Sequence, residues 1–166
     1  MAISVKSFDK VYSWGVLHHS PNTKKCFEEV WRVLRPNGIA KIMVYHKYSL
    51  VGLMLWTRYG LLKMNPFISI SSIYSKYLES PGTKAYSIKE IKKILKEYKI
   101  IECKVQLSFS DLLEGDVGQR HKGRLLSIIK IIYPKFLIKI ISKIIPIGLY
   151  LLITVQKYWC RWSRWL

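Results

Sequence analysis

The sequence predicts an α/β fold built around an open sheet whose first two strands are parallel. Two observations lead to this prediction. Residues 8–45 have the apolar patterns of a strand, a helix and a second strand. The connections between them are short enough for a parallel crossover. Further helix and strand patterns continue to residue 157, and 166 residues suit a single domain, residues 1–166.

The first three elements are predicted from residue type and spacing. Residues 8–17 (FDKVYSWGVL) are rich in β-branched and aromatic residues, which is typical of a strand. In the following helix, one face carries Phe27, Val30, Trp31 and Leu34. The turn residues Pro36-Asn37-Gly38 are expected to end this helix, and residues 39–45 (IAKIMVY) predict the second strand.

The middle of the chain predicts more helix than strand. Residues 46–80 are interpreted as a helical insert that contains a strong and a weaker helix pattern. Ser87 followed by Glu90 is a capping box, which predicts a helix start. Residues 100–109 predict a strand, Asp111 to Gly123 a polar loop, and residues 148–157 the final strand.

The last third of the chain is strongly basic. After Asp116 it contains ten Lys and Arg residues and no acidic residue. Residues 120–146 are interpreted as a basic amphipathic insert, in which Lys135, Lys139 and Lys143 share one helix face. This pattern is typical of an interfacial helix, of a lid over a lipid-like substrate, or of an ordinary helix packed on the sheet. The Trp- and Arg-rich tail, residues 158–166, suits either a bilayer interface or a poorly ordered terminus.

The net charge of +18 has two interpretations. Lys and Ile, with 21 and 22 residues, both have A/T-rich codons, so genome composition explains the charge as well as an anionic partner does. Arg is the residue that nucleic-acid binders favour, and only seven are present, so no nucleic-acid partner is expected. Three scattered cysteines argue against a disulfide scaffold or a zinc site and favour a reducing compartment. Because no targeting signal is visible and the longest apolar run has twelve residues, a cytoplasmic protein is expected, with membrane contact at most peripheral.

The segment FDKVYSWGVLHHSPNTKKCFEEVWRVLRPNGIAKIMVYH, residues 8–46, closely resembles part of a known enzyme family. It is similar to the second half of class I S-adenosylmethionine-dependent methyltransferases, of the small-molecule type related to quinone and sterol methyltransferases. In that family such a segment supplies the fourth strand, a helix ending in RVLRPNG, and the fifth strand. The resemblance implies an incomplete Rossmann-like methyltransferase sheet of strands four to seven, with helices on both faces and an extra amphipathic helical insert.

The resemblance also implies a set of site residues. The cofactor S-adenosylmethionine would be bound by Ser13, Trp14, Gly15, Val16 and Leu17. His18 and His19 would be catalytic, facing the transferred methyl group or the substrate, Tyr45 and His46 would line the substrate pocket, and no metal is expected. Open α/β sheets do bind ligands at the carboxyl ends of their parallel strands, and imidazole titrates near neutrality. On an extended strand, however, adjacent residues such as His18 and His19 would point to opposite faces. The alternative interpretation is that one histidine orients a loop and the other is solvated.

Two features of the family are missing from the sequence. There is no glycine-rich loop between a strand and a helix, and no acidic residue ends a preceding strand. The family's first three strands, on the order of 100 residues, have no counterpart before Phe8. We therefore expect a fragment whose first strand is an exposed apolar edge and which is poorly soluble alone.

Two functions stay open at this point. The first is methyl transfer to a small, apolar molecule, carried out with a separately encoded N-terminal half, or lost in an inactive remnant. The alternative is a non-enzymatic membrane-surface or protein-interaction module that uses the basic C-terminal third.

Overall fold

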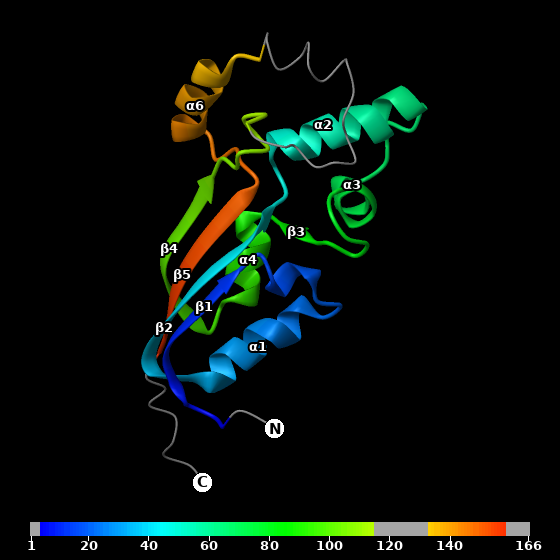
Figure 1. The fold of residues 1–166 in the computed structure, drawn as a ribbon. Helices are drawn as coiled ribbons and strands as arrows, with labels where there is room; N and C mark the ends of the chain where they lie inside the picture. Colours follow the sequence, from blue (N-terminus) through cyan, green and yellow to red (C-terminus); the bar gives the residue numbers. More distant parts are fainter. Residues whose placement is uncertain (1–3, 115–132, 159–166) are drawn as a thin grey trace.

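The structure is a computed structural model that describes residues 4–114 and 133–158 (Figure 1). Its sheet has the strand order β1-β2-β5-β4. These strands span Phe8–Trp14 for β1, Leu34–His46 for β2, Tyr150–Lys157 for β5 and Tyr98–Gln106 for β4. β1 and β2 are parallel, whereas β5 runs antiparallel to both β2 and β4. A short strand that was not predicted, β3 (Ala85–Tyr86), pairs with the carboxyl end of β2.

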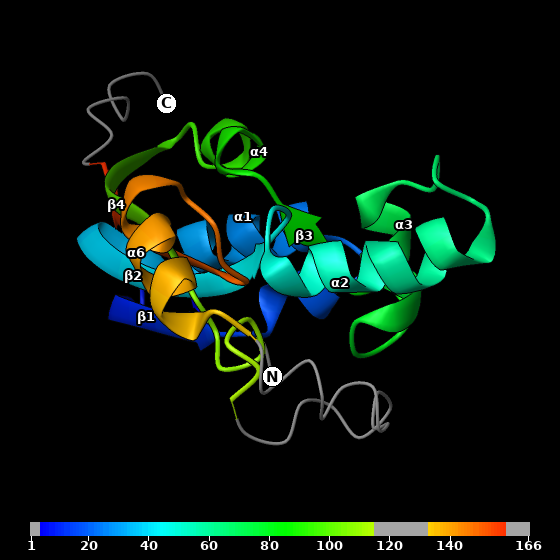
Figure 2. The same cartoon turned by 90° about the horizontal axis from the view of Figure 1, so that it is seen from above.

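The helices occupy one face and one end of this sheet. α1 (Thr23–Val33) and α4 (Ile88–Ile94) pack on one face. Near the carboxyl ends of β1 and β2 lie α2 (Leu50–Tyr59), α3 (Ile70–Tyr77), α6 (Lys135–Ile144), and the short 3₁₀ helices η1 (Leu17–His19) and η2 (Leu61–Lys63). Figure 2 looks onto this end and shows α2 and α6 nearest the viewer. The predicted α/β fold with an open sheet is confirmed. The expected helices on both faces are not found in the described residues, because α1 and α4 share one face and the other helices lie at one end of the sheet.

The buried core lies between the sheet and α1 with α4. Alternate residues of β2 and β5 point into it, as the period of two in a strand requires. Its buried members include Phe27, Val30, Leu34, Ala40, Ile42, Val44, Ile91, Leu95, Leu151, Ile153 and Val155. The predicted apolar face of α1 is confirmed, and so is the capping box of α4, where Ser87 and Glu90 bond each other's backbone N–H groups. Local signals and tertiary packing agree here.

The other face of β1 carries aromatic side chains that remain accessible. Tyr12 is 69% exposed and Trp14 is 48% exposed. Ring contacts continue from these residues to Tyr150 and Tyr45, and we call these four residues the aromatic strip. In the described part of the chain, β1 pairs with β2 alone, so its outer edge is free. The expected exposed edge at the first strand is therefore present.

Two predicted boundaries were wrong. The first strand was expected to continue to Leu17, but β1 ends at Trp14 because Gly15 adopts φ +70° and turns the chain into η1. The second strand was expected to start at residue 39. β2 instead begins at Leu34, and the register with β1 jumps where Asn37 adopts φ +65°. The turn signal there marks an irregularity within a strand.

Asp111 was expected in a polar loop, yet it is fully buried. Its Oδ2 accepts hydrogen bonds from the backbone N–H of Ser108 at 2.9 Å, from the Ser108 hydroxyl at 2.8 Å, and from the backbone N–H of Leu149 at 2.8 Å. Its Oδ1 accepts from the backbone N–H of Val51 at 3.2 Å. One carboxylate thus joins the end of β4, the start of β5 and the start of α2.

Lys157, at the end of β5, closes the carboxyl end of α1. Its Nζ donates to the backbone oxygens of Trp31 at 2.5 Å and Leu34 at 2.7 Å, and it lies 5.0 Å from the centre of the Trp31 ring. A cation at this position satisfies carbonyl groups that a helix end leaves without intrahelical partners. The last strand therefore fixes the first long helix.

The two basic segments are only partly described. Of the predicted insert, residues 120–132 lie outside the described residues, and residues 135–144 form α6 after Pro134. All of the tail except Tyr158 also lies outside them. None of the helices in the described ranges is long and apolar enough to cross a bilayer.

We predict that Asp111→Ala lowers the free energy of unfolding by about 3 kcal/mol, because it leaves buried N–H groups of three segments without an acceptor. Urea denaturation measures this change. Asp9→Ala is the control, since Asp9 forms an exposed ion pair with Arg35 and its loss should cost less than about 1 kcal/mol. Equal losses in the two variants would contradict the role assigned to Asp111.

We also predict that the free edge of β1 makes the chain self-associate. Tyr12→Lys places a charge beside this edge and should shift the molecular mass measured by light scattering towards that of a monomer. Tyr48→Lys is a matched control, because Tyr48 is 60% exposed but lies outside the strands. A wild-type chain that is monomeric and monodisperse would show this prediction to be wrong.

Candidate functional site

The site is built at the carboxyl end of β1. The N–H of Gly15 donates to the backbone oxygen of Met43 at 3.2 Å, which keeps the chain beside β2 as it turns. A side chain at this residue would be strained at φ +70° and would meet the Met43 methyl group. After this turn, η1 carries both histidines, and the backbone oxygen of His18 accepts from the N–H of Lys84 at 3.1 Å.

The two histidines lie on the same side of the turn. Their ring centres are 4.3 Å apart, and the His18 ring lies 4.2 Å from that of Tyr45. The expectation that adjacent histidines would point to opposite faces was wrong, because it assumed an extended strand where the chain forms a 3₁₀ turn. The structure thus brings together His18, His19 and Tyr45 from two neighbouring parallel strands.

His18 is fully buried. Neither ring nitrogen has a hydrogen-bond partner in the described part of the chain, and the same holds for the buried hydroxyl of Ser13. Burial, together with the nearby charge of His19, lowers the pKa of His18 to about 4. His18 is therefore neutral at physiological pH and presents one N–H and one lone pair at the end of β1.

His19 is half-buried and polar groups surround it. Its Nδ1 lies 3.1 Å from the Ser80 hydroxyl and 3.2 Å from the Thr83 hydroxyl. Its Nε2 lies 3.5 Å from Oε2 of Glu79. The Thr83 hydroxyl donates to the backbone oxygen of Ser80 at 2.7 Å, so its oxygen is available as an acceptor. A proton on either His19 nitrogen would therefore meet an acceptor.

Tyr45 completes the cluster from β2. Its hydroxyl donates to Oε1 of Glu79 at 2.6 Å. Burial, and then the bond to the Glu79 carboxylate, raise the pKa of Tyr45 far above its ordinary value. Tyr45 thus stays protonated and holds one oxygen of Glu79, while the other oxygen faces His19. We call His19, Tyr45, Glu79, Ser80 and Thr83 the His19 cluster.

The other predicted site residues lie at varying distances from this cluster. The Trp14 ring contacts that of Tyr150 in the aromatic strip, and Val16 is exposed. Leu17 packs against the main core. His46 is buried, and its Nδ1 donates to the backbone oxygens of Tyr48 and Gly148. Because these bonds hold the ring between two backbone segments, the structure does not bring His46 into the His19 cluster.

Three residues of the cluster were missed by the sequence analysis. Glu79, Ser80 and Thr83 follow α3. The first two were interpreted only as the end of a weak helix, and Thr83 only as part of a loop. These short polar residues indicate a turn, but the local sequence does not indicate that His19, about 60 residues earlier, lies beside them. A conserved pattern across relatives would be the signal needed to find them.

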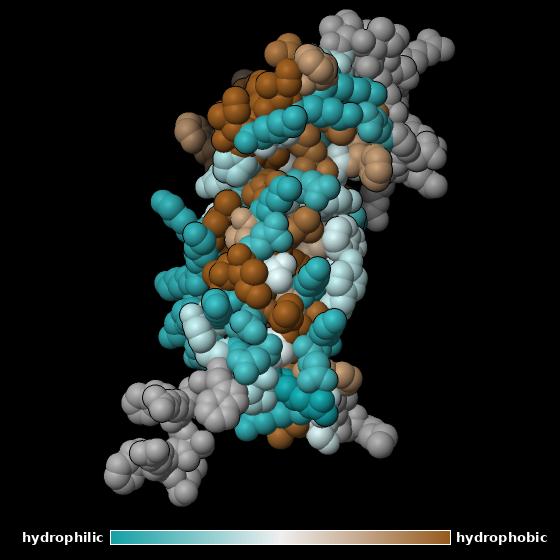
Figure 3. All heavy atoms as spheres, turned by 90° about the vertical axis from the view of Figure 1, so that its left-hand side faces the viewer, coloured by the Kyte–Doolittle hydropathy of each residue, from teal (hydrophilic) through white to brown (hydrophobic). Residues whose placement is uncertain are grey.

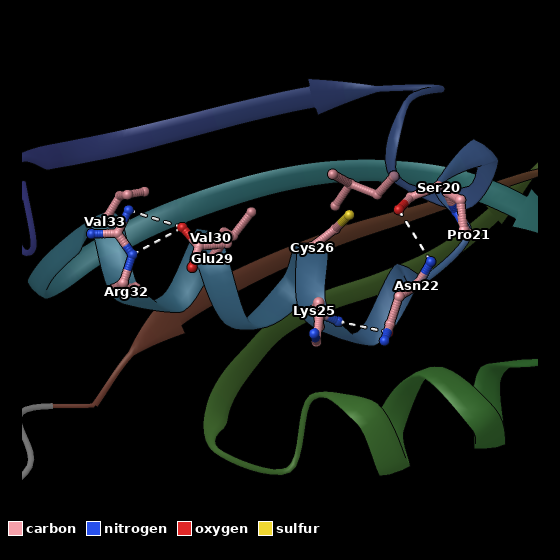
Figure 4. A pocket seen from close by; sticks show the side chains of 10 residues that line it. Ser20, Pro21, Asn22, Lys25, Cys26, Glu29, Val30, Arg32 and Val33 are labelled. Carbon is pink, nitrogen blue, oxygen red and sulfur yellow. Dashed lines mark hydrogen bonds and ion pairs between the residues drawn. The ribbon is translucent and has the colours of Figure 1, made fainter. Parts of the chain in front are cut away.

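A shallow groove of about 830 Å³ lies on the other side of β1, along α1 (Figure 4). Its polar side chains are engaged locally: Asn22 caps α1 and Glu29 pairs with Arg32. Cys26, Val30 and Val33 point from α1 towards β1. The groove therefore offers an apolar surface beside the free edge of β1.

The His19 cluster contains the groups that proton transfer requires. A carboxylate that is 53% exposed faces an imidazole, and both lie where substrates reach the end of a parallel sheet. Within residues 4–114 and 133–158, no group of three or more His, Cys, Asp or Glu side chains is arranged to hold a metal ion.

The comparisons with known proteins agree on a fold. A family model described as a methyltransferase domain matches residues 1–42. Among solved structures, an S-adenosylmethionine-dependent methyltransferase from Mesorhizobium loti is 13% identical with a TM-score of 0.52, and the match covers 95% of this chain and 65% of that one. A Haloferax volcanii methyltransferase solved with its activator Trm112 is 14% identical with a TM-score of 0.51, covering 95% and 57%.

A third similar structure contains the cofactor. Phosphoethanolamine N-methyltransferase 2 from Haemonchus contortus, in complex with S-adenosyl-L-methionine, is 15% identical with a TM-score of 0.51, covering 95% of this chain and 35% of that one. No curated protein matches the sequence. The chain thus has the fold of methyltransferases and spans about three fifths of the length of the first solved structures that it matches.

The end of β1 offers polar groups to a ligand. Ser13 and His18 have buried polar atoms without protein partners at the end of β1, beside the glycine turn, which suits a polar ligand there. The described residues contain neither a glycine-rich turn between a strand and a helix nor an acidic residue ending a strand beside β1. The described residues therefore fit S-adenosylmethionine only in part.

We predict that His18 makes stability fall with acid. Its folded pKa of about 4 lies below the ordinary 6.5, so between these values the unfolded chain binds a proton that the folded chain does not. Stability is thus lost as the pH drops from about 6.5 towards 4. In His18→Leu, the free energy of unfolding should fall by about 3 kcal/mol less than in the wild type over this pH range.

Urea denaturation of both proteins at several pH values measures the effect. His46→Leu is the comparison, since burial also lowers the pKa of His46 but its bonds to Gly148 and Tyr48 oppose that shift. Parallel stability curves for wild type and His18→Leu would contradict a neutral, buried His18.

Proposed function

We propose that this chain forms the substrate-facing part of an S-adenosylmethionine-dependent methyltransferase that acts on an oxygen, nitrogen or carbon of a small, apolar molecule. The observation that carries the proposal is the His19 cluster at the carboxyl end of the parallel strands. Its support is the methyltransferase fold of the solved structures that the chain resembles and the family match over residues 1–42. We take the subtype to be that related to quinone and sterol methyltransferases, to which residues 8–46 are similar.

In this proposal, bound S-adenosylmethionine would supply the methyl group. Glu79 holds the Nε2–H of His19, so the lone pair at Nδ1 accepts the proton of the substrate nucleophile, which is relayed through the Ser80 hydroxyl. Tyr45 keeps Glu79 in place through its hydroxyl, and Ser80 and Thr83 orient the imidazole at Nδ1. His18 and Ser13 offer their unpartnered polar atoms to the bound ligand at the end of β1. The aromatic strip, which includes Tyr45, forms the apolar wall of the substrate site.

We propose further that the glycine-rich loop and its acidic partner come from a separate segment that pairs with the outer edge of β1. The free edge would take a strand, and the aromatic strip and the groove along α1 offer apolar surface on its two sides. On this proposal, the 166-residue chain alone binds the cofactor weakly and does not turn over.

The test begins with the protein as its source cell makes it. The DNA upstream of Met1 reveals which polypeptide carries the chain, and a C-terminal affinity tag recovers it with whatever segment accompanies it. Transfer of labelled methyl groups from S-adenosylmethionine into a lipid extract is then measured. A recovered protein that neither binds the labelled cofactor nor transfers its methyl group would refute the proposal.

In that active form, we predict that His19→Ala and Glu79→Gln each lower kcat/KM by about 10²- to 10⁴-fold, because they remove the proton acceptor or the charge that holds it. Lys24→Ala is the control, since Lys24 forms an exposed pair with Glu28 on α1 and its loss should leave the rate unchanged. Unchanged turnover in both cluster variants would exclude proton removal by this cluster.

A further inference from the structure

α6 is an amphipathic helix whose apolar residues face outward. Of its ten residues none is buried. Phe136 is 77% exposed and Ile144 is 80% exposed, and Leu137, Ile140 and Ile141 are exposed as well. Figure 3 shows the apolar side chains of this helix gathered at one end of the molecule. Within residues 135–144, the apolar face is thus not packed on the sheet.

The lysines of α6 border this apolar face. Lys135 and Lys139 place their Nζ atoms 3.9 and 3.8 Å from Oε1 of Glu114, on the loop after β4. Lys139 and Lys143 also line a cleft of about 620 Å³ between α6 and β4. Lys135 and Lys139 thus tie the helix to the loop after β4, Lys139 and Lys143 stay exposed beside the apolar face, and that face is left for another surface.

A second apolar patch lies at the same end of the molecule. It follows α2, at η2 and the loop after it, where Leu62, Met64 and Phe67 are 73%, 90% and 96% exposed. Two cations, Arg58 and Lys63, lie over the Tyr59 ring beside it. α2 and α6 lie at this end in both views of the fold (Figures 1 and 2). Apolar side chains bordered by cations thus occur at two separate places, on α6 and after α2, at the same end of the molecule.

The size and charge of α6 indicate which surface it meets. A helix of ten residues is about 15 Å long, half the roughly 30 Å of a bilayer's hydrocarbon core, so it would lie in the interface and not cross it. The chain carries a net charge of +18, with no acidic residue after Asp116. Such a charge is complementary to an anionic lipid surface, where each lysine contributes about 1 kcal/mol of binding.

We propose that α6 docks this protein on the surface of an anionic phospholipid bilayer. Phe136, Leu137, Ile140, Ile141 and Ile144 enter the boundary between headgroups and acyl chains, while Lys139 and Lys143 remain among the anionic headgroups. The patch after α2 provides a second contact at the same end. This interaction does not depend on methyl transfer, because no residue of the His19 cluster takes part in it.

The experiment is co-sedimentation of the full chain with vesicles of phosphatidylcholine alone, and of phosphatidylcholine with about one quarter phosphatidylglycerol. We expect binding to the anionic vesicles that weakens as salt is added. The double variant F136S/I144S should lower the partition coefficient at least tenfold. Both side chains are exposed, so its melting temperature should equal that of the wild type.

A second pair of variants separates specific docking from general attraction. K139Q/K143Q should weaken binding about 25-fold, at about 1 kcal/mol for each lysine. K24Q/K25Q makes the same change of charge on exposed residues of α1 and should weaken binding less than threefold.

Three results would overturn the proposal. One is equal binding to neutral vesicles, and another is an equal loss in the two lysine pairs. The third is that F136S/I144S loses self-association, as seen by light scattering, while its vesicle binding is unchanged. That result would mean that a second copy of the chain covers the apolar face of α6. Because the vesicle assay contains no S-adenosylmethionine, each of these results leaves the methyl-transfer proposal to its own test.

Discussion

The buried carboxylate of Asp111 is the interaction on which the functional end of the molecule depends. Its two oxygens accept bonds from segments that follow β4, precede β5 and begin α2. A buried carboxylate is tolerated only when its lone pairs are satisfied, and here backbone N–H groups of three segments satisfy them. The helical region between β2 and β3 is thereby fixed against the end of the sheet.

From that point, a second set of polar contacts positions α3. The Tyr74 hydroxyl lies 2.6 Å from the Ser49 hydroxyl and donates to the backbone oxygen of His46. Gly52 of α2 allows this close approach, because any side chain there would collide with the Tyr74 ring. With α3 held in this way, the chain after it delivers Glu79 to His19 and Tyr45. The cluster is therefore a product of packing at one end of the sheet.

These contacts explain which features the sequence could predict. The strand–helix–strand unit was predictable because Phe27, Val30 and Leu34 recur at helical spacing between two apolar runs. The α4 start was predictable because a capping box is local. Glu79 was not, because its partners His19 and Tyr45 are 60 and 34 residues away. Asp111 was interpreted only as a loop residue. Its burial could not be predicted, because it depends on three segments that meet only in the folded chain.

The position of Lys157 and β5 late in the sequence affects when the sheet can form during synthesis. It lies 126 residues after Trp31, whose carbonyl it binds, and β5 fills the centre of the sheet between β2 and β4. A chain emerging from the ribosome thus holds the β1–β2 pair and β4 with no strand to join them until β5, residues 150–157, has been synthesised. Such long-range pairing slows folding and leaves strand edges exposed to other nascent chains. Protection by chaperones during synthesis would then matter more for this protein than for one whose strands pair in sequence order.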